Sequence, residues 1–110
     1  HVGDLVLQAG SKVLAELTRD SDMVARYGGE EFTLILNHVE LPDVEHIAER
    51  MRQSMAQYHW ESLAAGLQMT ISLGCAEYRL GDSVDDLMSR ADAALYRAKH
   101  EGRNCVRFQP

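Results

Sequence analysis

Two glycines and two adjacent carboxylates stand between two apolar runs in the segment RYGGEEF, residues 26–32. Glycine tolerates positive φ, so Gly28 and Gly29 can form a tight turn whose backbone N–H groups accept phosphate oxygens. Glu30 and Glu31 are neighbours, and in extended backbone their side chains point to opposite sides. Carboxylates beside such a turn suit nucleotide-bound Mg²⁺, which takes one or two carboxylates and completes its shell with phosphate and water. On residue types alone, a surface turn with solvated acids is the more frequent structure for such a segment.

Two cations near the C-terminus form a second candidate. Lys99 and Arg103 are four residues apart, so they lie on the same side of a helix if the helix persists that far. Such a pair suits the terminal phosphates of a nucleotide, because Arg can grip two oxygens at once. Taken singly, the pair is better explained as favourable charge at the C-terminal end of a helix.

A third candidate is Arg19 with Asp22, three residues apart in a polar loop. An Arg and an Asp at this spacing can hold a planar base or a phosphate, although most exposed pairs of this kind are solvated and contribute little. The histidines show no metal-ligand spacing, and no Ser or Cys lies in a nucleophile pattern.

The composition places limits on the function. At 110 residues the chain has room for one core, and its net charge of −6 argues against a protein that coats nucleic acid. The apolar runs are too short to cross a bilayer and no export leader is visible, so we expect no direct membrane contact. Cys75 and Cys105 lack disulfide or zinc spacing, and we expect two small buried residues in a reducing cytoplasm.

The periodicity of apolar residues predicts helices over residues 4–17, 44–59 and 84–98. Alternation predicts strands over residues 23–27, 32–36, 67–73 and 105–108. The first two strands are expected to form a hairpin with its tip at the glycines. This order of elements predicts an α/β sandwich with a mixed sheet.

Several single residues refine these elements. Asp4 is placed to cap the first helix or to lie in its first turn. Ser83 with Asp86 resembles a capping box, Val84 begins the apolar stripe of the last helix, and Gly102 is a natural stop. The third strand either continues past Gly74 as a long strand or contains a glycine bulge there.

Three motifs in order along the chain resemble the GGDEF family of diguanylate cyclases: RYGGEEF, ISLGCAEY at residues 71–78 and ADAALYRAKHEGRN at residues 91–104. Glu30 stands where the family often has Asp and keeps the carboxylate. The resemblance implies an α+β sandwich of the nucleotidyl-cyclase kind, with a mixed, largely antiparallel central sheet flanked by helices. It also implies that residues 1–110 are one partial GGDEF domain. The family's first strand and helix, with a metal-binding Asp, would precede His1, and without them the chain alone should be a poor cyclase.

The reaction that the resemblance implies is the condensation of two GTP into cyclic di-GMP and pyrophosphate by a two-fold homodimer, with Mg²⁺ or Mn²⁺ as cofactor. The residues that it assigns to this reaction are Glu30 as metal ligand and proton acceptor, Glu31 as second metal carboxylate, Gly28 and Gly29 beside the phosphates, Lys99 and Arg103 at the terminal phosphates, and Asp4 at the guanine edge.

The resemblance also implies regulation. Arg19 and Asp22 match the family's RxxD inhibitory site, and Arg50 stands where a neighbouring subunit can supply a second arginine. Cyclic di-GMP bound there would lock the two domains in a non-productive arrangement and give product inhibition. An upstream sensory or receiver domain is expected, and the parent protein could be anchored in a membrane.

Two other functions stay open at this point. The chain could be an inactive receptor that binds cyclic di-GMP through Arg19 and Asp22, or GTP through the glycine turn. It could also be a structural dimerisation domain, although that function explains none of the spaced polar motifs.

Overall fold

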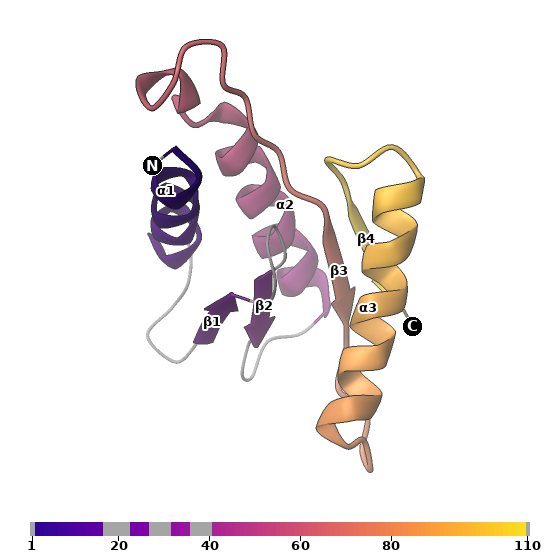
Figure 1. Ribbon diagram of the computed structural model, residues 1–110. Coiled ribbons are helices and arrows are strands. Elements are labelled where there is room, and N and C mark those ends of the chain that lie inside the picture. Colours follow the sequence, from indigo (N-terminus) through magenta and orange to yellow (C-terminus); the bar gives the residue numbers. More distant parts are fainter. Residues whose placement is uncertain (1, 17–22, 27–31, 36–40, 110) are drawn as a thin grey trace.

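The computed structural model describes residues 2–16, 23–26, 32–35 and 41–109 (Figure 1). The elements in chain order are α1 (Val2–Glu16), β1 (Met23–Arg26), β2 (Phe32–Ile35), α2 (Leu41–Gln57), the 3₁₀ helix η1 (Trp60–Ser62), β3 (Leu73–Ala76), α3 (Val84–His100) and β4 (Val106–Gln109). The predicted α+β class is confirmed. None of the helices in these ranges has both the length and the apolar character that a membrane crossing requires.

The four strands within the described ranges form two pairs, one antiparallel and one parallel. β1 and β2 are antiparallel, with Met23 opposite Ile35 and Arg26 opposite Phe32, which confirms the predicted hairpin pairing. The residues at the hairpin tip lie outside the described ranges. β3 and β4 are parallel, and α3 provides the crossover that parallel neighbours need. In the described residues each pair is a separate two-stranded sheet.

Strand β3 is shorter than its apolar alternation predicts, because its partner becomes available only at Leu73. The Leu73 N–H donates to the carbonyl of Cys105 at 3.0 Å, and Leu73 lies opposite Val106. The chain before Cys105 turns away from the ladder through left-handed residues 102–104. Residues 67–72 therefore do not form part of the strand, yet Leu67, Met69, Ile71 and Leu73 still pack against the core.

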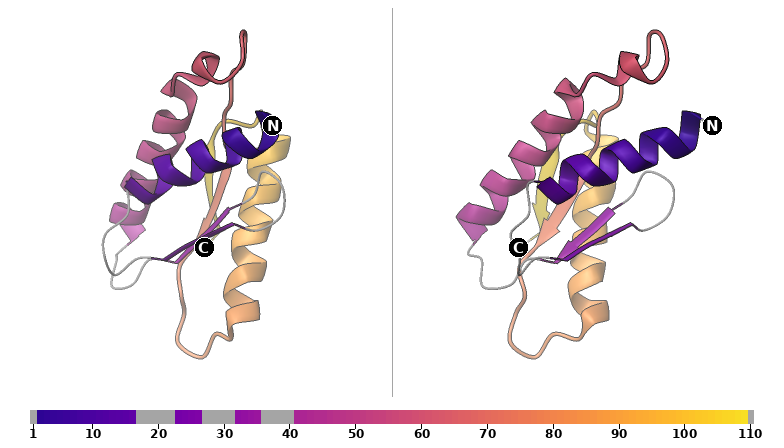
Figure 2. Two further views of the ribbon diagram at one scale, coloured as in Figure 1. Left: turned by 60° about the vertical axis from the view of Figure 1, so that its left-hand side comes forward. Right: turned by 90° about the vertical axis from the view of Figure 1, so that its left-hand side faces the viewer.

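Helices α2 and α3 lie on either side of β3 and β4 (Figure 2). Helix α3 approaches β3 unusually closely at Gly74, where a Cβ atom would lie 2.2 Å from the backbone nitrogen of Leu95. The register continues through Gly74 without an extra residue, so the glycine allows this approach and makes no bulge. Ala94 and Ala98 of α3 are fully buried. Val84, predicted in the apolar stripe, is the first residue of α3 and is 74% exposed, so its place in the buried stripe is wrong.

The core outside α3 is built on Met51, Met55 and Trp60, each at most 3% exposed. Helix α2 ends at Gln57, slightly before the predicted end, and η1 turns Trp60 back onto it. The Trp60 indole N–H donates to the carbonyl of Met55 at 2.7 Å. This bond satisfies a carbonyl of the last turn of α2, which lacks an intrahelical partner.

Candidate functional site

A pocket of about 230 Å³ lies between the segment before β3 and the C-terminal end of α3. The residues that line it are Gln68, Met69, Thr70, Ile71, Ser72, Leu95, Lys99 and Arg103. The structure thus brings Lys99 and Arg103, two predicted phosphate-binding residues, to one place. No acidic side chain is among the described residues that line the pocket, so its charge suits an anion.

The two cations meet in a way that the sequence spacing alone does not describe. Helix α3 ends at His100, before Arg103, so the condition that the helix persists that far is not met, and the predicted stop at Gly102 is confirmed. Instead Gly102 has φ of 120° and the Arg103 N–H donates to the carbonyl of Ala98 at 3.0 Å. This bond is the long one of a Schellman motif, which reverses the chain after a helix. The turn returns Arg103 to the pocket beside Lys99.

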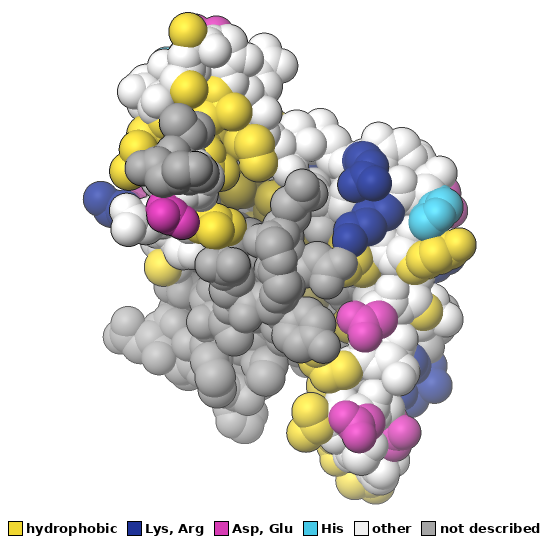
Figure 3. All heavy atoms as spheres, in the orientation of Figure 1, with side chains coloured by type: hydrophobic (Ala, Val, Ile, Leu, Met, Phe, Trp, Pro, Cys, Tyr) yellow, Lys and Arg dark blue, Asp and Glu magenta, His cyan; other side chains and the backbone are white. Residues whose placement is uncertain are grey.

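The charge along α3 is strongly graded. Asp85 and Asp86 occupy its first turn, and Arg97, Lys99 and His100 its last. In Figure 3 basic side chains gather over the upper end of this helix and acidic ones over its lower half, where a further basic group shows at the right edge. This order complements the helix dipole. It also places the positive charge of α3 at the end where the pocket lies.

The polar residues from the segment before β3 were not predicted as part of a site. Gln68, Thr70 and Ser72 alternate with apolar residues that pack against the core. Alternation directs every second side chain to the same side of an extended chain. The alternation in the sequence could have indicated this part of the site, because it places three polar side chains together on the side away from the core.

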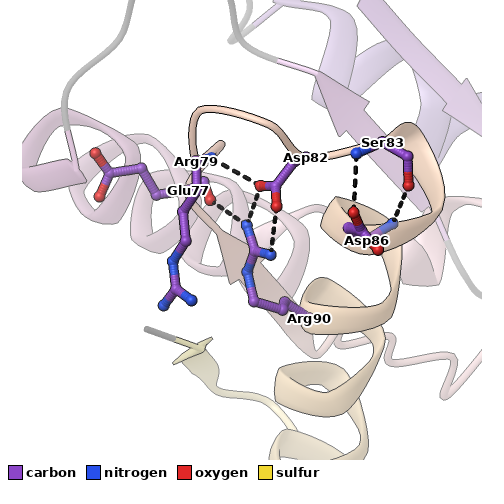
Figure 4. Close-up of polar contacts among 6 residues, drawn as sticks. All are labelled: Glu77, Arg79, Asp82, Ser83, Asp86 and Arg90. Atoms are coloured by element: carbon purple, nitrogen blue, oxygen red, sulfur yellow. Dashed lines mark hydrogen bonds and ion pairs between the residues drawn. The ribbon is translucent and has the colours of Figure 1, made fainter.

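A second polar cluster lies at the opposite end of α3, around Arg90 (Figure 4). Arg90 donates to both Asp82 oxygens, at 3.0 and 2.5 Å, and to the carbonyl of Glu77 at 2.7 Å. The Arg79 N–H donates to the same carboxylate at 2.7 Å. These hydrogen bonds lower the pKa of Asp82 to about 2, and those from Arg90 have the largest effect. The cluster fixes the loop between β3 and α3 and is structural.

The predicted capping box lies next to this cluster and is confirmed. The Asp86 N–H donates to the hydroxyl of Ser83, and the Ser83 N–H donates to the carboxylate of Asp86, both at 3.0 Å. Together the box and the Arg90 contacts hold the first turn of α3.

The remaining predicted site residues are distributed as follows. Asp4 lies exposed in the first turn of α1, which confirms its place in the helix, and it does not line the pocket. Arg50 is exposed on α2. Within the described ranges, no three His, Cys, Asp or Glu side chains lie close enough to hold a metal ion. The predicted residues outside those ranges are Arg19, Asp22, Gly28, Gly29, Glu30 and Glu31.

Both cysteines are free and half-buried. Burial, with a smaller effect from the negative charge of Glu45, raises the pKa of Cys75 to about 12. The thiol therefore stays protonated at neutral pH and does not act as a nucleophile.

Comparison with known proteins agrees with the sequence motifs. A family model described as "Diguanylate cyclase, GGDEF domain" matches residues 1–105. The chain is 38% identical over 105 residues to diguanylate cyclase A of Treponema denticola, covering 94% of this chain and 28% of that protein. It is 41% identical over 104 residues to diguanylate cyclase DgcM of Escherichia coli, covering 94% of this chain and 25% of that protein. The chain thus spans about a quarter of the length of these relatives.

Solved structures match over nearly all of the chain. The active GGEEF domain of a diguanylate cyclase from Vibrio cholerae has a TM-score of 0.87 and 30% identity, covering 97% of this chain and 68% of that one. The GGDEF domain of DgcB from Caulobacter crescentus, in complex with c-di-GMP, has a TM-score of 0.86 and 32% identity, covering 96% of this chain and 63% of that one.

Proposed function

This chain belongs to the GGDEF domain family of diguanylate cyclases, and from that premise we propose that it binds GTP and, paired with a second copy, forms cyclic di-GMP. The observation that carries the proposal is the pocket in which Lys99 and Arg103 meet beside the hydroxyls of Thr70 and Ser72. Two cations beside neutral hydrogen-bond donors suit the terminal phosphates of a nucleotide. GTP is a nucleotide of the cytoplasm, and we place the domain there.

The chemical step transfers a nucleotidyl group. The 3′-hydroxyl oxygen of one GTP bonds to the α-phosphorus of the other, the bond from that phosphorus to the bridging oxygen breaks, and pyrophosphate leaves. Glu30 accepts the hydroxyl proton. Lys99 and Arg103 hold the β- and γ-phosphates in the bound state and keep them in place through the transition state. Two such transfers close the ring, so each of two copies binds one GTP.

A divalent cation belongs to this proposal. Glu30 and Glu31 would hold Mg²⁺ or Mn²⁺, since carboxylate oxygens are the hard ligands that these ions prefer. When bound, the ion supplies charge neutralisation at the phosphates. Gly28 and Gly29 would allow the backbone to approach the same phosphates, and Asp4 would bind the guanine edge.

Product inhibition is the second part of the proposal. Arg19 and Asp22, with Arg50 of a neighbouring copy, would bind cyclic di-GMP. Arg50 is exposed on α2 and so is accessible to a second molecule. Arginine can stack on guanine and pair with phosphate, and Asp accepts hydrogen bonds from the guanine edge. An upstream sensory or receiver domain would control how the two copies meet.

The test uses the intact natural polypeptide that carries this sequence, given GTP and Mg²⁺, with the product identified by chromatography and mass spectrometry. We expect cyclic di-GMP and pyrophosphate, a loss of about 100-fold or more in kcat for Glu30→Ala, and a loss of about 100-fold in kcat/KM, mainly through KM, for Arg103→Ala. Lys12→Ala is the matched control, because Lys12 is an exposed cation on α1 away from the pocket.

Two outcomes would contradict the enzyme. Absence of product from the unmodified protein would overturn it, as would equal rates for Glu30→Ala and the control. If the protein made no product but bound cyclic di-GMP in calorimetry, and Arg19→Ala abolished that binding, the chain would be a receptor.

A further inference from the structure

Three consecutive residues after α3 have positive φ: Gly102 at 120°, Arg103 at 59° and Asn104 at 46°. Glycine adopts such angles freely, and Asn does so more readily than most residues. Arg has no such tolerance, because its Cβ is crowded in the left-handed region. A residue held in an unfavourable backbone conformation, next to a candidate site, points to a role for that conformation.

Contacts from three parts of the chain hold the turn. The Arg103 N–H donates to the carbonyl of Ala98 within α3, as described above. The Asn104 N–H donates to the hydroxyl of Ser72 at 3.1 Å. The Arg52 guanidinium on α2 donates through Nη1 to Oδ1 of Asn104 at 3.0 Å. Arg52 is itself held by an ion pair with Glu49 one turn earlier.

Two of these hydrogen bonds are made by Asn104, one through its backbone N–H and one through its side-chain oxygen. Asn104 does not line the pocket, whereas Arg103 before it and Ser72 opposite it do. Because α3 has already ended at His100, only this turn brings the Arg103 side chain back beside Lys99. Relaxation of Arg103 to the right-handed region would redirect its side chain and separate the two cations.

We propose that Asn104 is a positioning residue: held by Ser72 and Arg52, it keeps Arg103 left-handed so that the Arg103 guanidinium faces the terminal phosphates of GTP. This inference rests on the proposed function. Asn104 touches no phosphate in this arrangement, so its effect on GTP passes entirely through Arg103.

The test is a double-mutant cycle in the intact natural polypeptide, with KM and kcat for GTP as readouts. Asn104→Ala removes the acceptor for Arg52 and the tolerance of positive φ. Because the terminal phosphates are held in both the bound and the transition state, we expect mainly KM to rise, by about 10-fold. Asn104→Asp retains an acceptor and the left-handed tolerance, and it should stay within about twofold of the unmodified protein.

The decisive arm places Asn104→Ala in an Arg103→Ala background. We expect less than about a twofold further change in KM there, because the residue through which Asn104 acts is gone. Glu101→Gln is the matched control near the turn, since it breaks the ion pair with Arg107 and leaves Asn104 bound. It should leave KM unchanged.

Three results would overturn the positioning role. They are an unchanged KM for Asn104→Ala, an equal rise in KM with and without Arg103, and a rise of the same size for Glu101→Gln. If Asn104→Ala does not fold, Arg52→Met carries the same test, because methionine has no N–H donor and the substitution removes the hydrogen bond to Asn104 from outside the pocket. Failure of the proposed function is distinguishable, since the unmodified protein would then form no product or Arg103→Ala alone would have no effect.

Discussion

The Asp82 carboxylate accepts from the guanidinium of Arg90 and from the backbone of Arg79. These bonds favour the charged carboxylate, and its pKa falls from 3.8 to about 2. A lowered pKa in the folded state means that the unfolded state binds protons more readily at acidic pH. The contribution of Asp82 to stability is therefore present above about pH 4 and is lost as the pH falls towards 2.

We predict that Asp82→Asn weakens the dependence of stability on pH in this window. Urea midpoints at about pH 5 and about pH 2.5 should differ less for the variant than for the unmodified protein, because the variant cannot lose this carboxylate. Asp92→Asn is the control, since Asp92 is an exposed acid in the middle of α3. Equal pH dependence in Asp82→Asn and the unmodified protein would contradict the assignment.

At the scale of elements, the packing of α3 onto β3 decides where the pocket lies. The two elements touch at Gly74, where an added Cβ would lie 2.3 Å from the carbonyl oxygen of Ala91. This oxygen and the Leu95 nitrogen are both backbone atoms, which cannot rotate away as a side chain can. Because Lys99 lies on the same helix, any displacement of α3 from β3 also moves the cation away from the segment that lines the pocket.

Gly74→Ala should therefore destabilise the protein by about 1–3 kcal/mol or more, because the helix must move to admit the methyl group. Gly66→Ala is the matched control: its φ is 75° but no atom lies within 4 Å of the added Cβ. It should cost about 1 kcal/mol, the backbone penalty alone. Chemical denaturation would measure both, and equal losses would contradict the close packing of α3 on β3.

At the scale of the whole molecule, the proposed reaction needs two copies, since each supplies one GTP. An inactive copy that still pairs should therefore suppress an active one. The chain offers such a variant in Glu30→Ala, which removes the proposed proton acceptor.

We predict that a tenfold excess of Glu30→Ala lowers the cyclic di-GMP output of the unmodified protein to about one tenth, because most active copies then pair with inactive ones. The mixture is assayed at concentrations where specific activity no longer rises with concentration, so that pairing is complete. An equal excess of Lys12→Ala is the control and should raise the output. Unchanged output with Glu30→Ala would show that one copy is sufficient.

Much of the fold could be predicted because its signals are local. The capping box of Ser83 and Asp86, the hairpin pairing and the first-turn position of Asp4 each depend on residues only a few positions apart. The family could likewise be identified from short motifs, and the match of the family model over residues 1–105 confirms that identification. For these features the amino-acid sequence by itself was sufficient.

Other features were decided only by the tertiary structure. The start of β3 at Leu73 depends on where β4 becomes available, and the need for Gly74 depends on the backbone of α3. Above all, helical spacing does not explain how Lys99 and Arg103 meet, because the helix ends between them. The turn that brings them together is unfavourable for Arg in isolation. It persists because Ser72 and Arg52, 32 and 52 residues away from Asn104, bind it, and contacts at such distances exist only once the chain has folded.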